Sequence, residues 1–346
     1  MLLGNFPYAN VHIKTLGEWL WILKRREWPG GFLSTDDQLN QQAGWFNSSQ
    51  PERPQTAGDG KDILSPLADF RQANFSHTNL DWADLSDADV RHADLSYTHL
   101  EHAQLGLALM TSASLERASL ISDSRAEELD QYYQAHKSTG RPYAGVTVTS
   151  RQELLYIMRE RGWEGAPDSS PGSDPQKVVR ANLIGVDLTR LDLQCADLLG
   201  ADLTDAQLID DTRAAELRAA YKVGERPYND VAMHNANEVF WIFRERQWSG
   251  APDGVNDRYA GQFADLRGIN LKQAKLAGVY LCYAQFESAV VEGARLRGAR
   301  LIGASASSVR FQAVDLRHAD MSVLDGSKCN FEGSALIGAK FDTASL

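Results

Sequence analysis

Few side chains of this sequence are spaced for chemistry. The clearest group is His92, His99 and His102 beside Asp94 and Glu101, because imidazole and carboxylate groups close together can bind a metal ion. These histidines fall on outward positions of a repeat, and no second set of residues is spaced to orient them as metal-binding histidines require. We therefore interpret the group as a solvated surface cluster and expect no metal site there.

The cysteines do not indicate catalysis either. The sequence has three, Cys195, Cys282 and Cys329, which are too few and too scattered for a disulfide framework or a zinc site. A reactive thiol needs positive charge nearby, and none surrounds Cys195. The sequence also lacks a glycine-rich phosphate loop, an HExxH or CxxC motif and a Gly-x-Ser-x-Gly elbow. These observations predict a protein that is not an enzyme and uses no cofactor.

Composition narrows the class of protein further. The 346 residues include 35 Lys plus Arg and 46 Asp plus Glu, a net charge of -11, which argues against direct binding of nucleic acid. No signal peptide is visible, and the apolar stretch from Trp19 to Leu23 is far shorter than the ~20 residues that span a bilayer. We expect a soluble, cytoplasmic protein that does not contact a membrane.

A five-residue repeat organises about half of the sequence. An apolar central residue recurs at every fifth position, and a small residue, usually Ala, lies two positions before it. The repeat forms array one (67–121), array two (178–209) and array three (263–346), with 11, 6 and 17 central residues. The central residues run at intervals of five from Phe70 to Leu120, from Leu183 to Leu208 and from Leu266 to Leu346.

A period of five fits neither an amphipathic helix nor a strand. It fits a chain that turns a corner every five residues and closes a square of four edges, with successive squares stacked about 4.8 Å apart. One large and one small side chain of every five then face the interior. Such a chain is a solenoid, and its stability comes from the stacking of neighbouring coils.

The A(D/N)LXX pattern of these arrays resembles that of the pentapeptide-repeat proteins. The resemblance implies a mainly β fold, the right-handed quadrilateral β-helix. We therefore predict such a β-helix in three segments, interrupted by α-helical insertions.

A longer repeat separates the arrays. Residues 141–168 and 226–253 align without gaps, and residues 7–28 align with the first of these. Each copy predicts an extended piece followed by a capped helix, and further helices are predicted at 122–135 and 210–222. Each copy also contains an arginine that we expect to stack on the tryptophan two residues later: Arg26, Arg161 and Arg246.

These patterns predict seven segments. They are an N-terminal helical module (1–34), a flexible linker (35–66), array one, a second helical module with a loop (122–177), array two, a third helical module with a loop (210–262) and array three. The linker is rich in Gln, Asp, Pro, Gly and Ser, a composition typical of disorder. The sequence leaves open whether the arrays form one coaxial rod or separate blocks.

Acidic residues mark a candidate partner-binding patch on arrays one and two. Stacking predicts like charges about 5 Å apart, such as Asp69 under Asp89, which should be mildly destabilising. The alternative interpretation is that Asp suits the position before the central residue because it favours the turn. The candidate patch comprises Asp69, Asp81, Asp84, Asp89, Asp94, Glu101, Asp187, Asp192, Asp197 and Asp202.

The last coil of array three is a candidate contact between two copies of the chain. An uncapped coil exposes apolar residues and strand edges, so it should be covered. The sequence thus predicts a homodimer that meets end to end through Leu336, Phe341 and Leu346.

Two functions fit these features. The one we favour is a non-enzymatic scaffold that binds another protein, with exposed aromatic residues such as Trp45 and Trp82 as docking points. The alternative follows from the resemblance, since some pentapeptide-repeat proteins mimic DNA, bind type II topoisomerases such as DNA gyrase and protect them from inhibitors, which gives antibiotic resistance. The acidic patch favours mimicry, whereas the net positive charge of array three argues against it.

Overall fold

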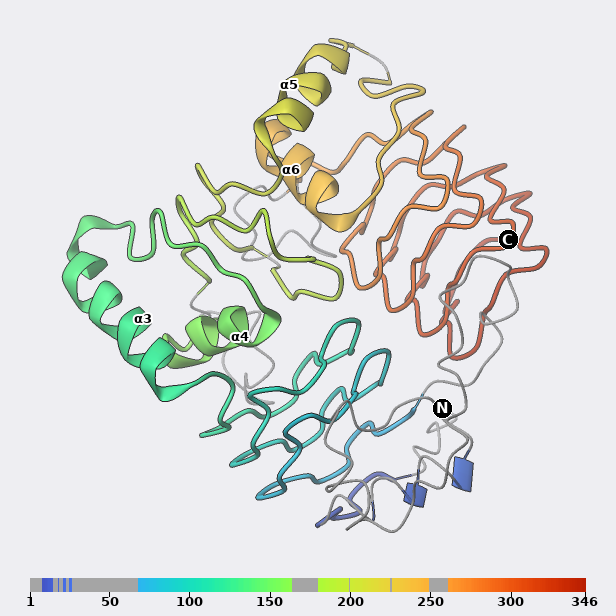
Figure 1. Cartoon of the computed structure of the whole chain (residues 1–346). Helices are drawn as coiled ribbons and strands as arrows, with labels where there is room; N and C mark the ends of the chain where they lie inside the picture. Colours follow the sequence, from blue (N-terminus) through green and yellow to red (C-terminus); the bar gives the residue numbers. More distant parts are fainter. Residues whose placement is uncertain are drawn as a thin grey trace, which may run out of the picture. The chain divides into compact units, whose positions relative to one another are not determined.

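The computed structural model describes residues 8–14, 18, 21–22, 25–26, 68–163, 180–198, 200–224, 226–248 and 261–346. The predicted linker, with Trp45, lies outside these ranges. The chain divides into two compact units. Unit 1 holds array one and helix α4 (Arg151–Glu160), and unit 2 holds arrays two and three with helices α5 (Asp211–Ala220) and α6 (Ala236–Arg246) (Figure 1).

All three arrays form coils in which equivalent residues stack, as the sequence predicts. Each edge of array one contributes one parallel β-bridge to the next coil, for example from Asp69 to Asp89. Two backbone hydrogen bonds close this bridge, because the amide of Phe70 donates to the carbonyl of Asp89 and the amide of Asp89 donates to the carbonyl of Ala68, both at 2.8 Å. In the described residues the predicted β-structure takes the form of such single-residue bridges rather than longer strands.

Central residues fill the interior, and corner residues adopt an unusual backbone. Phe70 and Leu183 have no exposed surface. The second residue of each corner turn commonly has a positive φ, such as 60° at His77 and 65° at Gly298. A residue with a side chain costs about 1–2 kcal/mol more in this left-handed conformation, and glycine avoids that cost.

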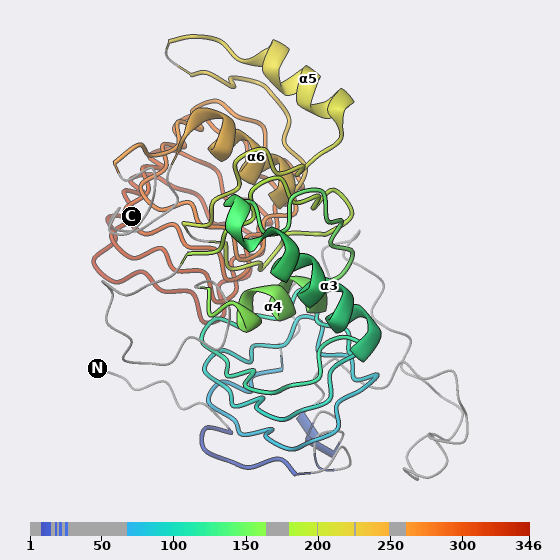
Figure 2. The same cartoon turned by 90° about the vertical axis from the view of Figure 1, so that its left-hand side faces the viewer.

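The helices lie in the insertions between the arrays. Helix α3 (Asp123–His136), a short 3-10 helix (Lys137–Thr139) and α4 follow array one, and α5 and α6 follow array two. Figures 1 and 2 show them as the only coiled ribbons of the described chain outside the first module. None of the described helices is long and apolar enough to cross a membrane.

Helix α6 shows how the sequence sets these boundaries. Asn235 accepts the amide hydrogen of Glu238 at 3.0 Å and so begins the helix. The helix ends at Gln247, whose φ of 57° is left-handed. Between these ends an apolar face is buried, including Trp241 with 2% of its surface exposed.

Each array begins on the extended segment of the module that precedes it. Parallel bridges join this segment to the array at His12 and Asn74, at Thr147 and Asp187, and at Ala232 and Asn270. The extended pieces predicted from the long repeat are therefore additional edges of the coils that follow them.

Helix α4 closes the last coil of array one. In that coil the carbonyls of the small residues have no following coil to pair with. The Gln152 side chain donates to the carbonyl of Ala103 at 2.5 Å, and the Arg159 guanidinium donates to that of Ala118 at 2.5 Å. Figure 2 shows α4 lying across this end of the array.

Helix α6 closes the last coil of array two in the same way. Asn237 donates to the carbonyl of Leu191 at 2.9 Å and accepts the amide hydrogen of Leu193 at 3.1 Å. Arg244 donates to the carbonyl of Ala206. Gln152 and Asn237 are equivalent in the long repeat, as are Arg159 and Arg244, so one capping arrangement occurs twice.

Arrays two and three are bonded to each other within unit 2. The amide of Cys195 donates to the carbonyl of Ala277 at 2.7 Å, and the Tyr280 hydroxyl donates to Asp197 at 2.9 Å. Burial and the nearby Asp197 carboxylate hold the pKa of Tyr280 well above its ordinary value. The tyrosine therefore remains a hydrogen-bond donor at this junction.

Candidate protein-binding surfaces

Most of the predicted acidic residues stabilise the turns in which they lie. The carboxylate of Asp84 accepts the amide hydrogen of Ser86 at 3.0 Å, and that of Asp94 accepts the amide hydrogen of Ser96 at 2.9 Å. The same bond to the residue two positions on occurs at Asp187, Asp192 and Asp202. Asp therefore occupies the position before the central residue because its side chain closes the turn.

Two acidic residues of array one are paired with arginine. Arg71 lies 2.6 Å from Asp69, Arg91 lies 2.6 Å from Asp89, and Asp89 has no exposed surface. Arg71 is also 3.5 Å from Asp89. The predicted repulsion between Asp69 and Asp89 is therefore wrong, because an arginine lies within reach of both carboxylates.

The predicted acidic patch is spread around the coils. In array one, the bridges place Asp69 and Asp89 on one edge, Asp94 on the next and Asp84 on another, and Asp81 accepts the Glu101 amide at a corner. In array two, the acidic residues occupy four successive edges, and one of them bonds to Tyr280. They are Asp187, Asp192, Asp197 and Asp202. Neither array presents its acidic residues as one flat surface.

A different feature distinguishes the surface of array one: two neighbouring corners carry stacked rings. His77 stacks on Tyr97 with ring centroids 4.6 Å apart, and Trp82 stacks on His102 at 4.2 Å. Arg117 continues the first stack, 5.7 Å from the Tyr97 ring. We call these five residues the aromatic corner face. The corners flank a single edge of the coil, so the two stacks run side by side along the array.

The aromatic corner face is exposed and fixed in place. Trp82 is 44% exposed and Tyr97 is 38% exposed. Their φ values are 65° and 58°, a conformation that bulky residues rarely adopt. Backbone bonds hold the corners, since the Tyr97 amide donates to the Glu116 carbonyl at 2.8 Å. Trp82 was predicted from the sequence as an exposed aromatic residue, whereas its stacking on His102 was not, although the two residues lie 20 positions apart and so occupy equivalent corners of adjacent coils.

The histidines do not assemble a metal site. His102 stacks on Trp82, His99 lies on the edge between the two stacks, and His92 occupies a different corner. Over the part of the chain that the structure describes, no group of three His, Cys, Asp or Glu side chains could hold a metal ion.

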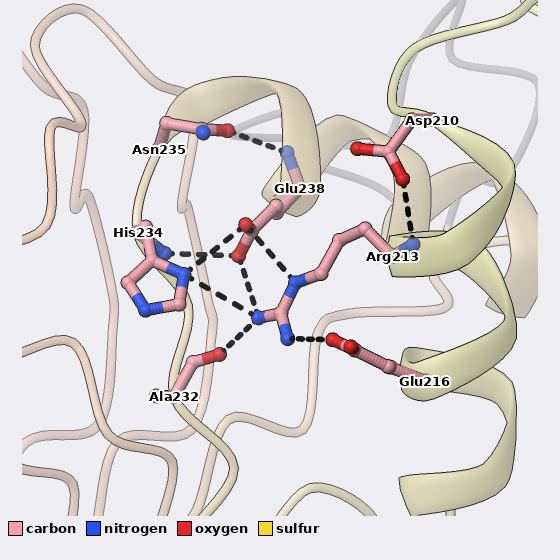
Figure 3. Close-up of polar contacts among 7 residues, drawn as sticks. All are labelled: Asp210, Arg213, Glu216, Ala232, His234, Asn235 and Glu238. Atoms are coloured by element: carbon pink, nitrogen blue, oxygen red, sulfur yellow. Dashed lines mark hydrogen bonds and ion pairs between the residues drawn. The ribbon is translucent and has the colours of Figure 1, made fainter.

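A repeated ion pair joins the helices of each insertion. Arg213 on α5 lies 3.1 Å from Glu238 on α6, and it also donates to Glu216 and to the carbonyl of Ala232 (Figure 3). The Glu238 carboxylate also accepts the amide hydrogen of His234 at 2.9 Å. Although partial burial opposes the charge, the bonds to Glu238 and Glu216 raise the pKa of Arg213 above its ordinary value. This contact network fixes the start of α6.

The arginine at the end of the first and of the third module contacts tyrosine. Arg246 donates to the Tyr228 hydroxyl at 3.1 Å and lies 3.7 Å from the centre of the Tyr221 ring. Arg26 donates to the Tyr8 hydroxyl at 3.2 Å. The predicted stacking on tryptophan is therefore wrong for Arg246, because Tyr228 and Tyr221 are its partners. Trp28, the predicted partner of Arg26, lies outside the described residues.

The predicted dimer contact lies on the last coil of array three. Leu336 is 37% exposed and Leu346 is 64% exposed, whereas Phe341 is half-buried and packs edge-on against Phe331. The three residues share the last coil of array three, and each is less buried than its counterparts in arrays one and two.

Comparison with solved structures finds pentapeptide-repeat proteins. The chain is 19% identical to HetL of Nostoc sp. strain PCC 7120, a protein involved in heterocyst differentiation, with a TM-score of 0.20 over 81% of this chain and 80% of HetL. It is 27% identical to a pentapeptide repeat protein of Cyanothece 51142, with a TM-score of 0.15, over 23% of this chain and only 62% of that protein. QnrB1, a plasmid-mediated fluoroquinolone resistance protein, is 11% identical over 79% of this chain and 80% of QnrB1, with a TM-score of 0.15.

The repeats themselves provide the assignment. No curated protein matches the chain. The family model described as pentapeptide repeats matches eight copies, at residues 67–91, 180–210, 264–303, 284–322 and 307–342. These copies fall within the arrays whose coils stack by parallel bridges, in keeping with the quadrilateral β-helix of that family. The three arrays of the chain thus consist of pentapeptide repeats.

Proposed function

We propose that the protein is a non-enzymatic scaffold that binds another protein through the aromatic corner face of array one. The observation that carries this proposal is the pair of exposed ring stacks, His77 on Tyr97 and Trp82 on His102. Tryptophan and tyrosine are over-represented among residues that dominate binding energy at protein interfaces.

Rigidity supports this assignment. A ring already stacked on its neighbour loses little conformational entropy on binding, so more of the contact energy appears as affinity. The left-handed backbone at Trp82 and Tyr97 makes each an unfavourable place for a large side chain. In array three the same corner position is often glycine, whereas no corner of array one has glycine there. Array one therefore places a side chain, with its conformational cost, at each of these corners.

Charge around the face favours a partner of mixed polarity. Arg117 continues one stack, and Glu101 lies next to His102 in the other. An interface with aromatic residues at its centre and charges of both signs at its rim is the usual arrangement in protein complexes.

The DNA-mimic alternative has weaker support in the structure. It requires a continuous acidic surface, whereas Asp89 is buried against Arg91 and the other carboxylates occupy several edges. Binding to DNA gyrase or another type II topoisomerase therefore stays the second candidate function.

The test of the scaffold compares three immobilised proteins: the wild type, a Trp82→Ala/Tyr97→Ala variant and a Val290→Ala/Val323→Ala control. The control residues are 44% and 54% exposed on array three. A partner should be retained by the wild type and the control and lost by the aromatic variant. Calorimetry with the purified partner should show binding weakened about 100-fold or more, as expected when two hot-spot residues are removed. Equal binding by all three proteins refutes the proposal.

A gyrase supercoiling assay with an inhibitor tests the alternative. The variant Asp84→Asn/Asp94→Asn/Asp187→Asn/Asp202→Asn removes four charges while each amide oxygen can still accept the hydrogen bond of its turn. Protection by the wild type that this variant and added salt both abolish establishes mimicry. Absence of protection by the wild type at any concentration excludes it.

A further inference from the structure

The edge between the two ring stacks of array one already uses its backbone groups within the coil. Parallel bridges join Asn79 to His99 and His99 to Ser119. The amide of His99 donates to the carbonyl of Thr78 at 3.2 Å, and the carbonyl of His99 accepts the amide hydrogen of Leu80 at 2.9 Å. A partner that adds a strand needs unpaired backbone donors and acceptors on the surface that it joins. The aromatic corner face is therefore unsuited to strand addition.

The side chains between the stacks are unsuited to a partner helix. An amphipathic helix docks by laying its apolar face in a hydrophobic groove. The outward residues of this edge include Asn79 and His99, which are exposed and polar. The exposed apolar surface is therefore limited to the rings of the two stacks.

The rings and the edge between them carry side-chain hydrogen-bond donors. Trp82 has an indole N–H and Tyr97 has a hydroxyl, and neither group donates a hydrogen bond within the residues that the structure describes. The side-chain oxygen of Asn79 accepts the amide hydrogen of Asp81 at 2.9 Å, which leaves its NH2 group as a further donor. A polyproline II segment has no internal hydrogen bonds, so its carbonyls accept from such donors while its proline rings pack on aromatic side chains.

The charge of the face is complementary to a basic segment. Three carboxylates flank the rings, those of Asp81, Glu101 and Glu116, against the single guanidinium of Arg117. The Asp81 carboxylate accepts the amide hydrogen of Glu101 at 2.9 Å, and the Glu101 carboxylate lies 3.9 Å from the imidazole of His102. Two of the three carboxylates therefore lie together at the second stack, where a lysine or arginine of a partner would pair with them.

We propose that the aromatic corner face binds a proline-rich segment of a partner protein that carries an arginine or lysine at one end. The inference rests on the proposed scaffold function and names the class of its partner. The proline rings pack on Trp82 and Tyr97, the indole and the hydroxyl donate to carbonyls of the segment, and the basic residue pairs with Glu101. Both surfaces are stiff before they meet, so little conformational entropy is lost on binding.

The experiment uses the full chain and a fluorescein-labelled peptide of about nine prolines, or about three polyproline turns, that ends in two arginines. Fluorescence polarisation should show saturable binding with one peptide per chain. Trp82→Ala should weaken binding at least tenfold, as expected for a hot-spot residue. Tyr283→Ala is the matched control and should bind as the wild type does, because Tyr283 is a ring-stacked residue that is 37% exposed on array three.

Further comparisons separate proline recognition from charge attraction and from loss of the fold. A peptide in which glycine and serine replace the prolines, with the same two arginines, should bind at least tenfold more weakly. Glu101→Gln should weaken binding of the arginine peptide about threefold, since an exposed ion pair contributes little, and should not weaken binding of a peptide that ends in glutamates. Tyr97→Phe keeps the ring stack and removes only the hydroxyl donor, so it should weaken binding about threefold even if Trp82→Ala lowers the temperature of unfolding.

Three results would overturn the proposal. They are equal binding of the proline and the glycine–serine peptides, binding that both Trp82→Ala and Tyr97→Phe leave unchanged, and no binding at millimolar peptide. If the peptide does not bind but the Trp82→Ala/Tyr97→Ala variant still loses its partner in the capture experiment, the scaffold function stands and only the class of partner is wrong. Equal capture by the wild type, this variant and the control refutes both.

Discussion

The guanidinium of Arg213 lies 3.1 Å from the carboxylate of Glu238 and ties α5 to α6. The same relationship recurs in the other insertion, where Arg125 at the start of α3 lies 3.0 Å from Glu153 in α4. Both pairs connect a helix that follows an array to the helix that closes that array. The contact therefore holds the cap in position over the coil end.

Replacing Arg213 with alanine should lower the free energy of unfolding by about 2 kcal/mol, because Glu238 would be left nearly buried without its charged partner. Urea denaturation followed by circular dichroism measures the change. Glu216→Ala provides the control, since Glu216 is 58% exposed and exposed ion pairs contribute less than about 1 kcal/mol. Equal losses for the two variants would contradict this role of the pair.

The stability of the junction between arrays two and three should depend on Gly278. A Cβ atom at this position would lie 2.6 Å from the Cα atom of Cys195, and the φ of Gly278 is 67°. Gly278→Ala should therefore lower the free energy of unfolding by about 3 kcal/mol, since backbone strain and a steric clash both contribute. Gly333→Ala is the matched control, because Gly333 has a φ of 72° but a Cβ atom added there would lie no closer than 3.8 Å to its neighbours. The free energy of unfolding of this control, measured by thermal unfolding, should fall by only about 1–2 kcal/mol. A control loss as large as that of Gly278→Ala would contradict the expected clash.

Stability should decline at acidic pH through the paired carboxylates, of which Asp265 is a clear case. Partial burial opposes its charge, but hydrogen bonds from Arg267 lower the pKa of Asp265 below its ordinary value of 3.8. A lowered folded-state pKa stabilises the protein above pH 3.8, and this contribution is lost as the pH falls through the folded-state pKa. Urea denaturation at pH 7, 4 and 3 should show that the free energy of unfolding falls less on acidification for Asp265→Asn than for the wild type. Identical pH profiles would refute the linkage.

The thiol of Cys329 should react slowly. Burial raises its pKa from 9.0 to about 11, and its Sγ atom donates to the carbonyl of Ala306 at 3.0 Å. The thiolate fraction at pH 8 is then about 100-fold lower than in the unfolded chain. Peptide mapping after iodoacetamide treatment should show about 100-fold slower alkylation of Cys329 in native than in urea-denatured protein. Comparable rates would contradict the burial of this thiol.

The sequence was sufficient to predict the coil and its phase, because the period of five determines which residues stack. It also located the helices near 122–135 and 210–222, found as α3 and α5. The periodicity alone could not predict that Asp89 would be buried. Its pairing with Arg91 depends on how an Asp-x-Arg spacing folds along one edge of the coil.

Tertiary docking accounts for what the sequence analysis missed. Nothing in the apolar pattern of α4 or α6 distinguishes Gln152 and Asn237 from other polar residues, because their role depends on where a helix rests on a coil. The tyrosine partner of Arg246 was missed for the same reason, since Tyr221 and Tyr228 approach it only in the folded chain.

The caps on arrays one and two have a consequence for aggregation. A coil end with free carbonyls and amides can recruit a strand from another molecule, and repetition of that event builds a fibre. Gln152 and Arg159 occupy the acceptors at one such end, and Asn237 and Arg244 occupy those at the other. The insertions therefore protect these ends of arrays one and two against axial polymerisation.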